Sequence, residues 1–454
     1  MSNQERIEQL VNPSGKKRKD MTSRERVQML QRKLYLSAKQ EKRMKFYVLY
    51  DKVFLDYILK ESWQRVKSNG GSSGIDEQNF EDIERYGVEK YLGELKEELR
   101  KRTYKPSAVK RGYIPKPNGE QRPLGIPTIK DRIAQMACKL VIEPIFEADF
   151  EESSYGFRPK KTAQEAVIKI KEHLQAGRTE VYDADLSKYF DTIPHDKMLK
   201  TLETRISDPR ILELIKLWLK APVYEDGNYR GGRKSTVGTP QGGVISPLLA
   251  NIYLHLLDRI VNNRAGIFAK EGIHIVRYAD DFVLMGRKLS AEAMKKLRGT
   301  LERMELQINE GKSKQIEARQ TPFNFLGFTI RNDRSFYDSK KRFWHIKPSD
   351  KSNKRIRQNI NMYLKRVGHY PPQELVKGLN WKIRGWINYF EIKGVSYTST
   401  PKRELYWYLR ERLYQYFNRK SQRKTRLYRQ QAYTILVEKY GLIDPMKYQA
   451  RAVL

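Results

Sequence analysis

The sequence predicts an α+β fold in which a mixed core of strands and helices is followed by a basic, helical domain. Of the 454 residues, 39% are hydrophobic and 11% aromatic, which is enough for a sizeable buried core. In the middle of the chain, short apolar runs alternate with segments of helical periodicity. From about residue 331 onward helical periodicity dominates, and the length of the chain suggests two to four domains.

The charge of the chain indicates a polyanionic partner. There are 89 Lys and Arg against 54 Asp and Glu, a net charge of +35. A compact protein with this charge repels itself unless a polyanion compensates it, so nucleic acid is the leading partner. The charge alone fits a structural RNA-binding protein equally well.

The excess charge is concentrated in the two flanks. Residues 1–45 contain 13 basic and 5 acidic residues, and residues 331–454 contain 29 basic and 9 acidic residues. Only +7 of the net charge therefore remains for the 285 residues from 46 to 330.

Several classes of protein are excluded. No run of 18 apolar residues is present to span a bilayer, and the N-terminus lacks the apolar segment of a secretory signal. Cys138 is the only cysteine, which excludes intramolecular disulfides and Cys-based zinc or iron–sulfur sites. It lies in an apolar helical stretch, so we expect a small core residue.

The predicted elements follow from periodicity and turn residues. Residues 16–19 belong to a basic segment, and periodic apolar residues begin only at Val27. A hairpin turn is expected at residues 116–120, and Ser246 is expected to cap a helix that has Pro247 in its first position. Helices are predicted at residues 46–68, 88–101, 131–146, 162–176, 195–205 and 292–306, and strands at 180–185, 273–277, 282–285 and 323–330.

The sharpest local feature is a pair of adjacent carboxylates at the tip of an apolar hairpin, in Tyr278-Ala279-Asp280-Asp281. Carboxylates between strands this apolar are costly unless they face water or bind a cation. Mg²⁺ prefers carboxylate oxygens and shares its remaining positions with phosphate. Taken alone, the dipeptide fits an ordinary solvated turn as well.

A second strand also ends in a carboxylate. The strand at 180–185 ends at Asp185, and Tyr189-Phe190-Asp191 follows it. If the two strand ends lie side by side, Asp185, Asp280 and Asp281 form a site for two metal ions. Such sites serve phosphoryl transfer, because one metal lowers the pKa of an attacking hydroxyl and the other stabilises the leaving oxygen. For Asp183 we expect a position that faces solvent or lies opposite the core, and for Asp191 a role in capping or bracing a turn.

A third feature is a glycine-rich turn that leads directly into a helix, Gly238-Thr239-Pro240-Gln241-Gly242-Gly243-Val244-Ile245-Ser246-Pro247. Backbone can approach a ligand closely at glycine, and a helix N-terminus favours phosphate. By itself such a turn also fits the simple start of a helix.

In order and character these features resemble a reverse transcriptase, most closely the group II intron reverse transcriptase/maturase family. Asp185 with the Tyr-Phe-Asp that follows resembles the first palm motif, and Tyr278–Asp281 resembles the polymerase signature. Residues 114–127, 131–132 and 154–159 resemble the fingers. Residues 311–314 and 325–328 resemble later palm motifs, and residues 383–390 resemble the maturase-specific thumb.

The resemblance implies roles for the site residues. Asp185, Asp280 and Asp281 would bind two Mg²⁺ and carry the catalysis. Phe190 would lie under the sugar and disfavour a ribose 2′-OH, and Gln241 would border the nascent base pair.

Three cations are implied to contact the triphosphate. Lys116 and Arg122 would hold it, although Arg122 also fits pairing with a structural carboxylate. Lys312 would act near the leaving pyrophosphate, or is a surface lysine. Further cationic and aromatic residues are expected to bind nucleic acid: Arg384, Trp386, Lys16, Lys17, Arg18 and Lys19.

The resemblance implies a right-hand polymerase with fingers, palm and thumb. We expect a basic N-terminal extension at residues 1–45, fingers and palm at 46–335, a helical thumb/maturase domain at 336–425, and a short basic segment at 426–454 as a candidate for contact with DNA. With one cysteine and 64 residues after Phe390, we expect no endonuclease domain.

The implied function is an RNA-directed DNA polymerase that also binds its intron RNA to assist splicing and retrohoming. Its partners would be the RNA template, the intron RNA, a DNA primer or target and dNTPs, with no membrane. We expect it in the bacterial cytoplasm, in a ribonucleoprotein or with the nucleoid. The alternatives are a splicing-only maturase, or a reverse transcriptase of a CRISPR, diversity-generating or phage-defence system.

Overall fold

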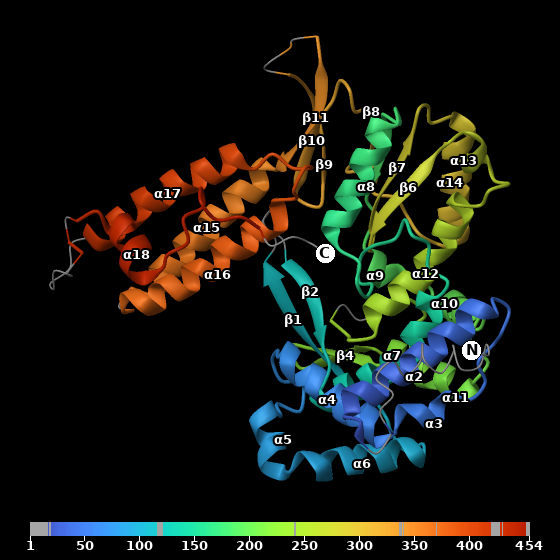
Figure 1. Cartoon of the computed structure of the whole chain (residues 1–454). Helices are drawn as coiled ribbons and strands as arrows, with labels where there is room; N and C mark the ends of the chain where they lie inside the picture. The colour runs from blue at the N-terminus through green and yellow to red at the C-terminus, as the bar shows by residue number, and fades with distance from the viewer. Residues whose placement is uncertain are drawn as a thin grey trace.

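The fold has three parts, as the computed structural model shows for residues 17, 20–115, 121–239, 242–335, 338, 340–368, 370–418, 427–428 and 430–450 (Figure 1). N-terminal helices lie at the bottom of the view, a sheet with its covering helices at the upper right, and C-terminal helices at the left. The mixture of helices and sheets is the one that the sequence predicts. No helix in the described ranges is both long enough and apolar enough to cross a bilayer.

The N-terminal helices share one hydrophobic core. Val27 and Leu34 of α2 are buried in the same cluster as Leu59 and Ile133, so the core does not divide near residue 45. Thr22 and Glu25 form a capping box that fixes the start of α2. The helices are α2 (Ser23–Gln40), α3 (Tyr50–Val53), α4 (Asp56–Asn69), α5 (Phe80–Tyr86), α6 (Val88–Arg100) and α7 (Ile129–Glu147).

The helix predicted at residues 46–68 is divided in two. Leu55 adopts an extended conformation and stands at the N-cap of α4, so the chain leaves helical geometry between α3 and α4. Phe54 and Leu55 both pack against the core from this break. Periodicity alone does not reveal it, because both sides of the break have the same apolar spacing.

A small sheet connects these helices to the centre of the chain. Its strands are β1 (Val109–Pro115), β2 (Gln121–Ile126), β4 (Pro222–Glu225) and β5 (Asn228–Gly231), in the order β2-β1-β4-β5. β1 and β2 pair antiparallel with Pro115 opposite Gln121, as the predicted hairpin requires. The turn itself, residues 116–120, lies outside the described residues.

The central sheet is antiparallel and has two differently covered faces. It consists of β6 (His274–Tyr278), β7 (Asp281–Gly286), β3 (Glu180–Ala184) and β8 (Lys314–Glu317), in the order β6-β7-β3-β8. One face carries Ala184 and Phe282 into the core shared with the N-terminal helices. The other face carries Val181 and Val283 into the core shared with the C-terminal helices.

Helices cover both faces of the central sheet. α12 (Ser246–Val261) and α14 (Ala291–Arg303) pack on the first face, and α8 (Ala163–Gln175) packs on the second. Ser246 does not cap α12 as predicted. The N-cap is Ile245, which makes no side-chain cap bond, because the preceding turn enters the helix one residue earlier. The remaining short helices are α9 (Tyr189–Thr192), α10 (His195–Leu202), α11 (Pro209–Leu219), α13 (Ile267–Lys270) and η2 (Gly232–Lys234).

The C-terminal part begins with a three-stranded sheet. The single strand predicted at residues 323–330 is two strands, β9 (Phe323–Phe325) and β10 (Phe328–Arg334), which pair antiparallel. Leu326 and Gly327 both have positive φ (49° and 81°), and this left-handed turn reverses the chain. β11 (Arg342–Pro348), which the sequence did not reveal, pairs with β10.

Four helices follow within the described ranges. They are α15 (Asp350–Arg366), α16 (Pro372–Phe390), α17 (Ser399–Asn418) and α18 (Ala432–Tyr440). Leu436 of α18 is buried in the same cluster as Leu409 of α17 and Ile383 of α16. The packing therefore continues past residue 426, where a separate segment was expected.

Candidate active site

The register of the central sheet brings the predicted carboxylates to one edge. β3 and β7 pair antiparallel with Ala184 opposite Phe282. The next position along β3 is Asp185, and the preceding position in β7 is Asp281, so these two residues follow the last ladder pair on neighbouring strands. Asp280 precedes Asp281 in the turn between β6 and β7.

The β6–β7 turn is tight. Tyr278 pairs with Asp281, which leaves only Ala279 and Asp280 in the loop. Ala279 has a φ of +57°, a left-handed conformation that is uncommon outside glycine, asparagine and aspartate. Because two-residue hairpins need positive φ in the loop, the turn has a restricted geometry that presents Asp280 next to Asp281.

The carboxylates interact electrostatically. Desolvation, followed by repulsion from Asp280, Asp185 and Asp183, raises the pKa of Asp281 to about 7. Desolvation and the charge of Asp185 also raise the pKa of Asp280. The Asp281 side chain is exposed to solvent, so water screens part of this repulsion.

Asp183 lies on the same face of β3 as Asp185 because the two residues are two positions apart. It is half-buried rather than freely solvated, and it is paired in the ladder with Lys314. Desolvation and the charge of Asp185 raise its pKa to about 6, while Lys314 lowers it. The site thus has a fourth carboxylate at its margin.

The loop before β8 is fastened to the end of β3. The Asp185 N–H donates to Ser313 Oγ (3.0 Å), and the Asn309 N–H donates to the Asp185 carbonyl (2.8 Å). The same loop places Lys312 Nζ 3.4 Å from Asp185 Oδ2. Lys312 was predicted either at the pyrophosphate or on the surface, and its side chain is both exposed and directed at Asp185.

The oxygen atoms of Asp185, Asp280 and Asp281 are of the kind that a divalent cation prefers, although these carboxylates do not surround a single point. No three His, Cys, Asp or Glu side chains in the described ranges converge closely enough to hold an ion in this conformation. Even so, mutually repelling carboxylates meet at one sheet edge, and the ammonium of Lys312 lies beside one of them. A hard cation that prefers oxygen ligands would neutralise the repulsion between these carboxylates, once their side chains rotate toward it.

Phe190 and the glycine-rich turn are joined by backbone hydrogen bonds. The Thr239 N–H donates to the Phe190 carbonyl at 2.7 Å. The half-buried ring of Phe190 packs edge-on against Tyr189, whose hydroxyl donates to the Ala250 carbonyl (2.7 Å). Gly242 has a φ of +115°, and a Cβ there would lie 2.3 Å from the Gly125 carbonyl oxygen of β2. Glycine is thus required where this turn meets the hairpin.

Arg122 of β2 faces the same site. It lowers the pKa of both Asp280 and Asp281, so its guanidinium lies within electrostatic reach of them. No carboxylate within the described residues forms an ion pair with it. Lys116 and Gln241, the other two residues predicted to contact nucleotide or template, lie outside the described residues.

The residues predicted to bind nucleic acid differ in exposure. Arg384 on α16 and Lys17 are exposed. Trp386 is only 8% exposed and packs against Phe390 with ring centroids 5.4 Å apart, so its ring forms part of the core of the C-terminal helices. Lys16, Arg18 and Lys19 lie outside the described residues.

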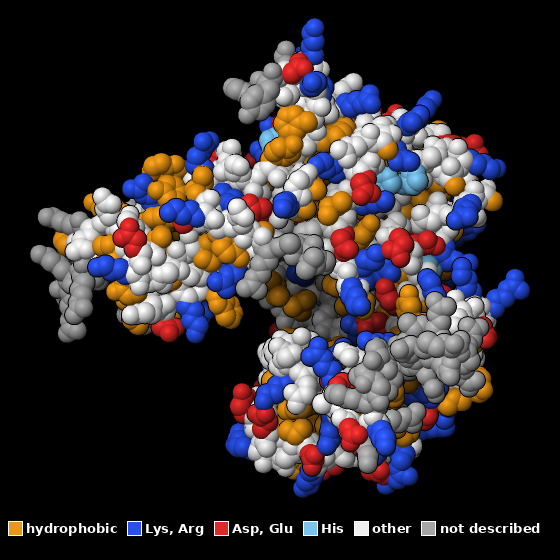
Figure 2. Space-filling model, viewed as in Figure 1, with side chains coloured by type: hydrophobic (Ala, Val, Ile, Leu, Met, Phe, Trp, Pro, Cys, Tyr) orange, Lys and Arg blue, Asp and Glu red, His pale blue; other side chains and the backbone are white. Residues whose placement is uncertain are grey.

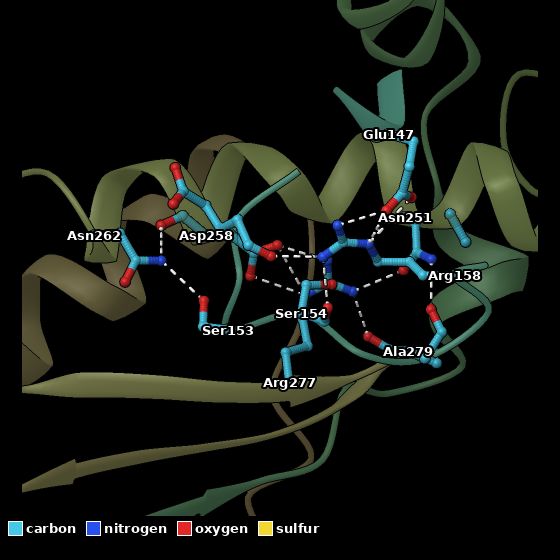
Figure 3. Close-up of polar contacts among 12 residues, drawn as sticks. Glu147, Ser153, Ser154, Arg158, Asn251, Asp258, Asn262, Arg277 and Ala279 are labelled. Carbon is cyan, nitrogen blue, oxygen red and sulfur yellow. Dashed lines mark hydrogen bonds and ion pairs between the residues drawn. The ribbon is translucent and has the colours of Figure 1, made fainter. Parts of the chain in front are cut away.

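A buried polar network behind the β6–β7 turn was not predicted (Figure 3). Arg277 of β6 lies between Asp258 and Asn251 of α12 and reaches the Ala279 carbonyl in the turn. Arg277 and Asp258 have no exposed surface. The sequence does carry a signal for this network, because an arginine inside an otherwise apolar strand requires a buried partner.

Two family matches cover most of the described chain. Residues 114–330 match the family described as reverse transcriptase (RNA-dependent DNA polymerase). Residues 353–434 match the maturase-specific domain of group II introns. The first match contains Asp185, Asp280 and Asp281, and the second contains α16 and α17.

Curated relatives agree with these matches. Protein YkfC of Escherichia coli is 38% identical over 277 residues, which cover 54% of this chain and 72% of YkfC. Group II intron-encoded protein LtrA of Lactococcus lactis subsp. cremoris is 38% identical over 216 residues, which cover 47% of this chain and 35% of LtrA. The chain therefore spans most of the first relative but about a third of the second.

One solved structure, titled partial Cas6-RT-Cas1–Cas2 complex, is 21% identical to this chain. The match covers 56% of this chain and 42% of the chain in that structure, with a TM-score of 0.35. A likeness this weak supports no conclusion about fold or function. The family matches, the YkfC and LtrA similarities and the carboxylates at the sheet edge agree with one another. The chain belongs to the group II intron-encoded reverse transcriptase/maturase family.

Proposed function

We propose that this protein extends a DNA 3′-OH on an RNA template with dNTPs, and that it also binds its intron RNA to assist splicing and retrohoming. The observation that supports the proposal most strongly is the register of β3 and β7, which brings Asp185 beside Asp281 next to the Asp280 turn. In a member of this family, carboxylates gathered at a sheet edge are best explained as ligands of catalytic divalent metal ions.

We propose that Asp185, Asp280 and Asp281 bind two Mg²⁺ ions. When bound, such ions supply Lewis acidity toward the primer hydroxyl and the leaving phosphate oxygens. The protein's part is to hold the three carboxylates close together. Lys312 Nζ lies 3.4 Å from Asp185 Oδ2, and this exposed lysine would contact the leaving pyrophosphate.

The other site residues would select and orient the nucleotide. Arg122, within electrostatic reach of Asp280, would hold the triphosphate together with Lys116. The ring of Phe190 would lie under the sugar, where a ribose 2′-OH would clash with it, and Gln241 would border the new base pair. The hydrogen bond between Thr239 and Phe190 links these two functions mechanically.

The nucleic acid would be held mainly by the flanks. We assign α2–α7 with the β1–β2 hairpin to the fingers, the central sheet to the palm and α15–α18 to the thumb. Figure 2 shows the visible face hollowed between these parts, with Lys and Arg side chains spread around it. Arg384 and Lys17 would contact RNA or DNA phosphates, whereas Trp386 would act indirectly by stabilising α16. We expect the protein to work in a bacterial ribonucleoprotein.

Primer extension on an RNA template tests this proposal. Asp280→Asn keeps the shape of the side chain and removes its charge, so we expect at least about a thousandfold loss of extension, since a metal ligand is worth several kcal/mol. Asp226→Asn is the matched control, because Asp226 is an exposed turn residue with positive φ that asparagine tolerates. Equal extension by wild type and Asp280→Asn would contradict the site, and tight RNA binding without extension by the wild type would favour a splicing-only maturase.

A further inference from the structure

One buried cation lies directly behind the β6–β7 turn and has no part in the function described so far. We propose that Arg277 is a positioning residue for Asp280: it fixes the peptide that joins Ala279 to Asp280. This inference rests on the proposed polymerase function. It adds a residue, distinct from the metal ligands, on which their geometry depends.

One end of the arginine is held by a bidentate ion pair. Arg277 Nε donates to Asp258 Oδ1 (2.9 Å), and Nη2 donates to Asp258 Oδ2 (2.5 Å). Both side chains are completely buried. A guanidinium held in this way by a carboxylate is locked in orientation, because the fork geometry fixes its plane.

The other end of the guanidinium contacts the turn. Nη1 donates to Asn251 Oδ1 (2.9 Å) and to the Ala279 carbonyl oxygen (2.7 Å). The Ala279 carbonyl and the Asp280 N–H belong to the same planar peptide unit. Holding the carbonyl therefore sets the direction in which the chain continues to the Asp280 Cα, and thus where its carboxylate begins.

A second segment contacts the same turn from outside. A Cβ on Gly156 would lie 2.2 Å from the Ala279 nitrogen, so only glycine allows this approach. Asn251 Nδ2 donates to the Gly156 carbonyl (2.7 Å), and the Tyr155 N–H donates to the Arg277 carbonyl (2.9 Å). Asn251 thus connects the arginine to the segment that closes over the turn (Figure 3).

The arrangement is more specific than stability requires. A buried ion pair can often be replaced by apolar residues of similar volume without loss of stability. Apolar residues, however, cannot donate to the Ala279 carbonyl, which accepts a hydrogen bond from Arg277 Nη1 at 2.7 Å. The donor to this carbonyl is therefore the feature that the positioning role requires and the folding role does not.

The first test compares two buried arginines. Arg277→Lys keeps the charge opposite Asp258 but cannot reach Asp258, Asn251 and Ala279 together. Arg205→Lys is the matched control, because Arg205 is 3% exposed, pairs with Asp149 (3.0 Å) and donates to several backbone carbonyls far from the turn, those of Ala38, Glu41, Lys42 and Met44.

For Arg277→Lys we expect the single-turnover extension rate to fall by about 10- to 100-fold, the effect of a displacement on the order of 1 Å at a reacting centre. The Kd for template–primer should stay within about twofold, because the change lies behind the site. Arg205→Lys should keep the wild-type rate at temperatures below its Tm, whatever that Tm is.

The second test removes the ion pair without leaving a buried charge. The double variant Arg277→Met/Asp258→Leu keeps apolar volume and is expected to fold. We predict that it binds Mn²⁺ several-fold more weakly than wild type, measured without nucleotide by the decrease of the free-ion EPR signal. Its extension rate should fall like that of Arg277→Lys.

The outcomes separate this inference from the proposed function. Reduced rate and weakened Mn²⁺ binding in folded Arg277 variants would support the positioning role. Wild-type rate and wild-type Mn²⁺ affinity in either folded Arg277 variant would overturn it while leaving the polymerase proposal intact. If the wild-type protein itself failed to extend primers, the proposed function would fall, and this inference with it.

Discussion

The central sheet and the C-terminal helices use charge in opposite ways. Behind the β6–β7 turn the charged groups are few, buried and paired, as in Arg277 with Asp258. On α15 and α16 they are numerous, exposed and largely of one sign, as in Lys354, Arg355 and Arg384. The first arrangement fixes atoms in place, and the second supplies a field that does not depend on the exact position of any one side chain.

This difference agrees with what each region is proposed to do. Nucleotidyl transfer needs carboxylates held in a narrow range of positions, whereas a long polyanion can be held by many interchangeable contacts. A mutation in the first region should therefore change rate with little change in affinity. A mutation in the second should change affinity with little change in rate.

The largest effect that distinguishes the two regions should come from salt. If the basic flanks make about 6–10 phosphate contacts, RNA affinity should fall by about 10³- to 10⁵-fold between 50 and 200 mM salt, because counterions are released on binding. The single-turnover rate of a preformed complex should change little. Filter binding and rapid quench on the same template–primer measure the two quantities.

A matched pair of variants sharpens this prediction. Lys377→Gln/Arg384→Gln changes two exposed cations on α16 and should reduce the salt slope by about two units. Lys295→Gln/Lys296→Gln changes two exposed cations on α14 and should leave the slope unchanged. An RNA affinity that does not change with salt concentration would contradict binding through contacts between these cations and phosphates.

The second prediction concerns two tryptophans on the same helix. Trp386 is 8% exposed and Trp381 is 72% exposed. Trp386→Ala should lower the free energy of unfolding of the C-terminal helices by about 3–5 kcal/mol, because it leaves a cavity. Trp381→Ala should change it by no more than about 0.5 kcal/mol. Urea unfolding followed by circular dichroism measures both, and equal destabilisation would show that the assignment of faces on α16 is incorrect.

The smallest expected effect is a pH dependence in the central sheet. The pKa of Asp281 is about 7 in the folded protein, above that of an unfolded aspartate near 3.8. The folded state therefore holds this proton more tightly, and stability falls as pH rises from about 4 to 7. In EDTA, Asp281→Asn should raise Tm by about 1–2 °C at pH 8 and by less at pH 5, since solvent screens an exposed carboxylate.

Calorimetry with and without Mg²⁺ tests the origin of this effect. Added Mg²⁺ should stabilise the wild type more than Asp281→Asn, because a bound cation removes the repulsion that the substitution removes. If Asp281→Asn lowered the Tm, or raised it more at pH 5 than at pH 8, the result would contradict a raised pKa of Asp281.

The central carboxylates could be predicted because their placement follows from local patterns. Alternating apolar strands that end in Asp185 and begin at Asp281 need only antiparallel pairing to bring these residues together, and β3 and β7 pair in that way. The loop conformation of the β6–β7 turn follows from its length. Local sequence therefore carried most of the information about the metal-binding candidates.

The residues that contact the β6–β7 turn from other segments could not be predicted, because their roles depend on contacts between parts of the chain that are distant in sequence. Gly156 and Asn251 are 95 residues apart in the sequence, and only the fold brings them together at the turn. The division at Leu55 likewise depends on how α3 and α4 pack.

Trp386 was predictable in principle. It follows Leu379 and Ile383 at helical spacing, and both of those residues are buried. The same spacing places Trp386 on the buried face of α16, whereas the resemblance of residues 383–390 to the maturase-specific thumb suggested contact with nucleic acid.

The most direct test of the account compares rate and affinity in one titration. Single-turnover extension is measured against template–primer concentration for wild type, Asp280→Asn and Lys377→Gln/Arg384→Gln. We predict that Asp280→Asn loses at least about a thousandfold in maximal rate with Kd nearly unchanged, and that the α16 variant loses affinity with its maximal rate nearly unchanged. Loss of affinity without loss of maximal rate in Asp280→Asn would contradict the account.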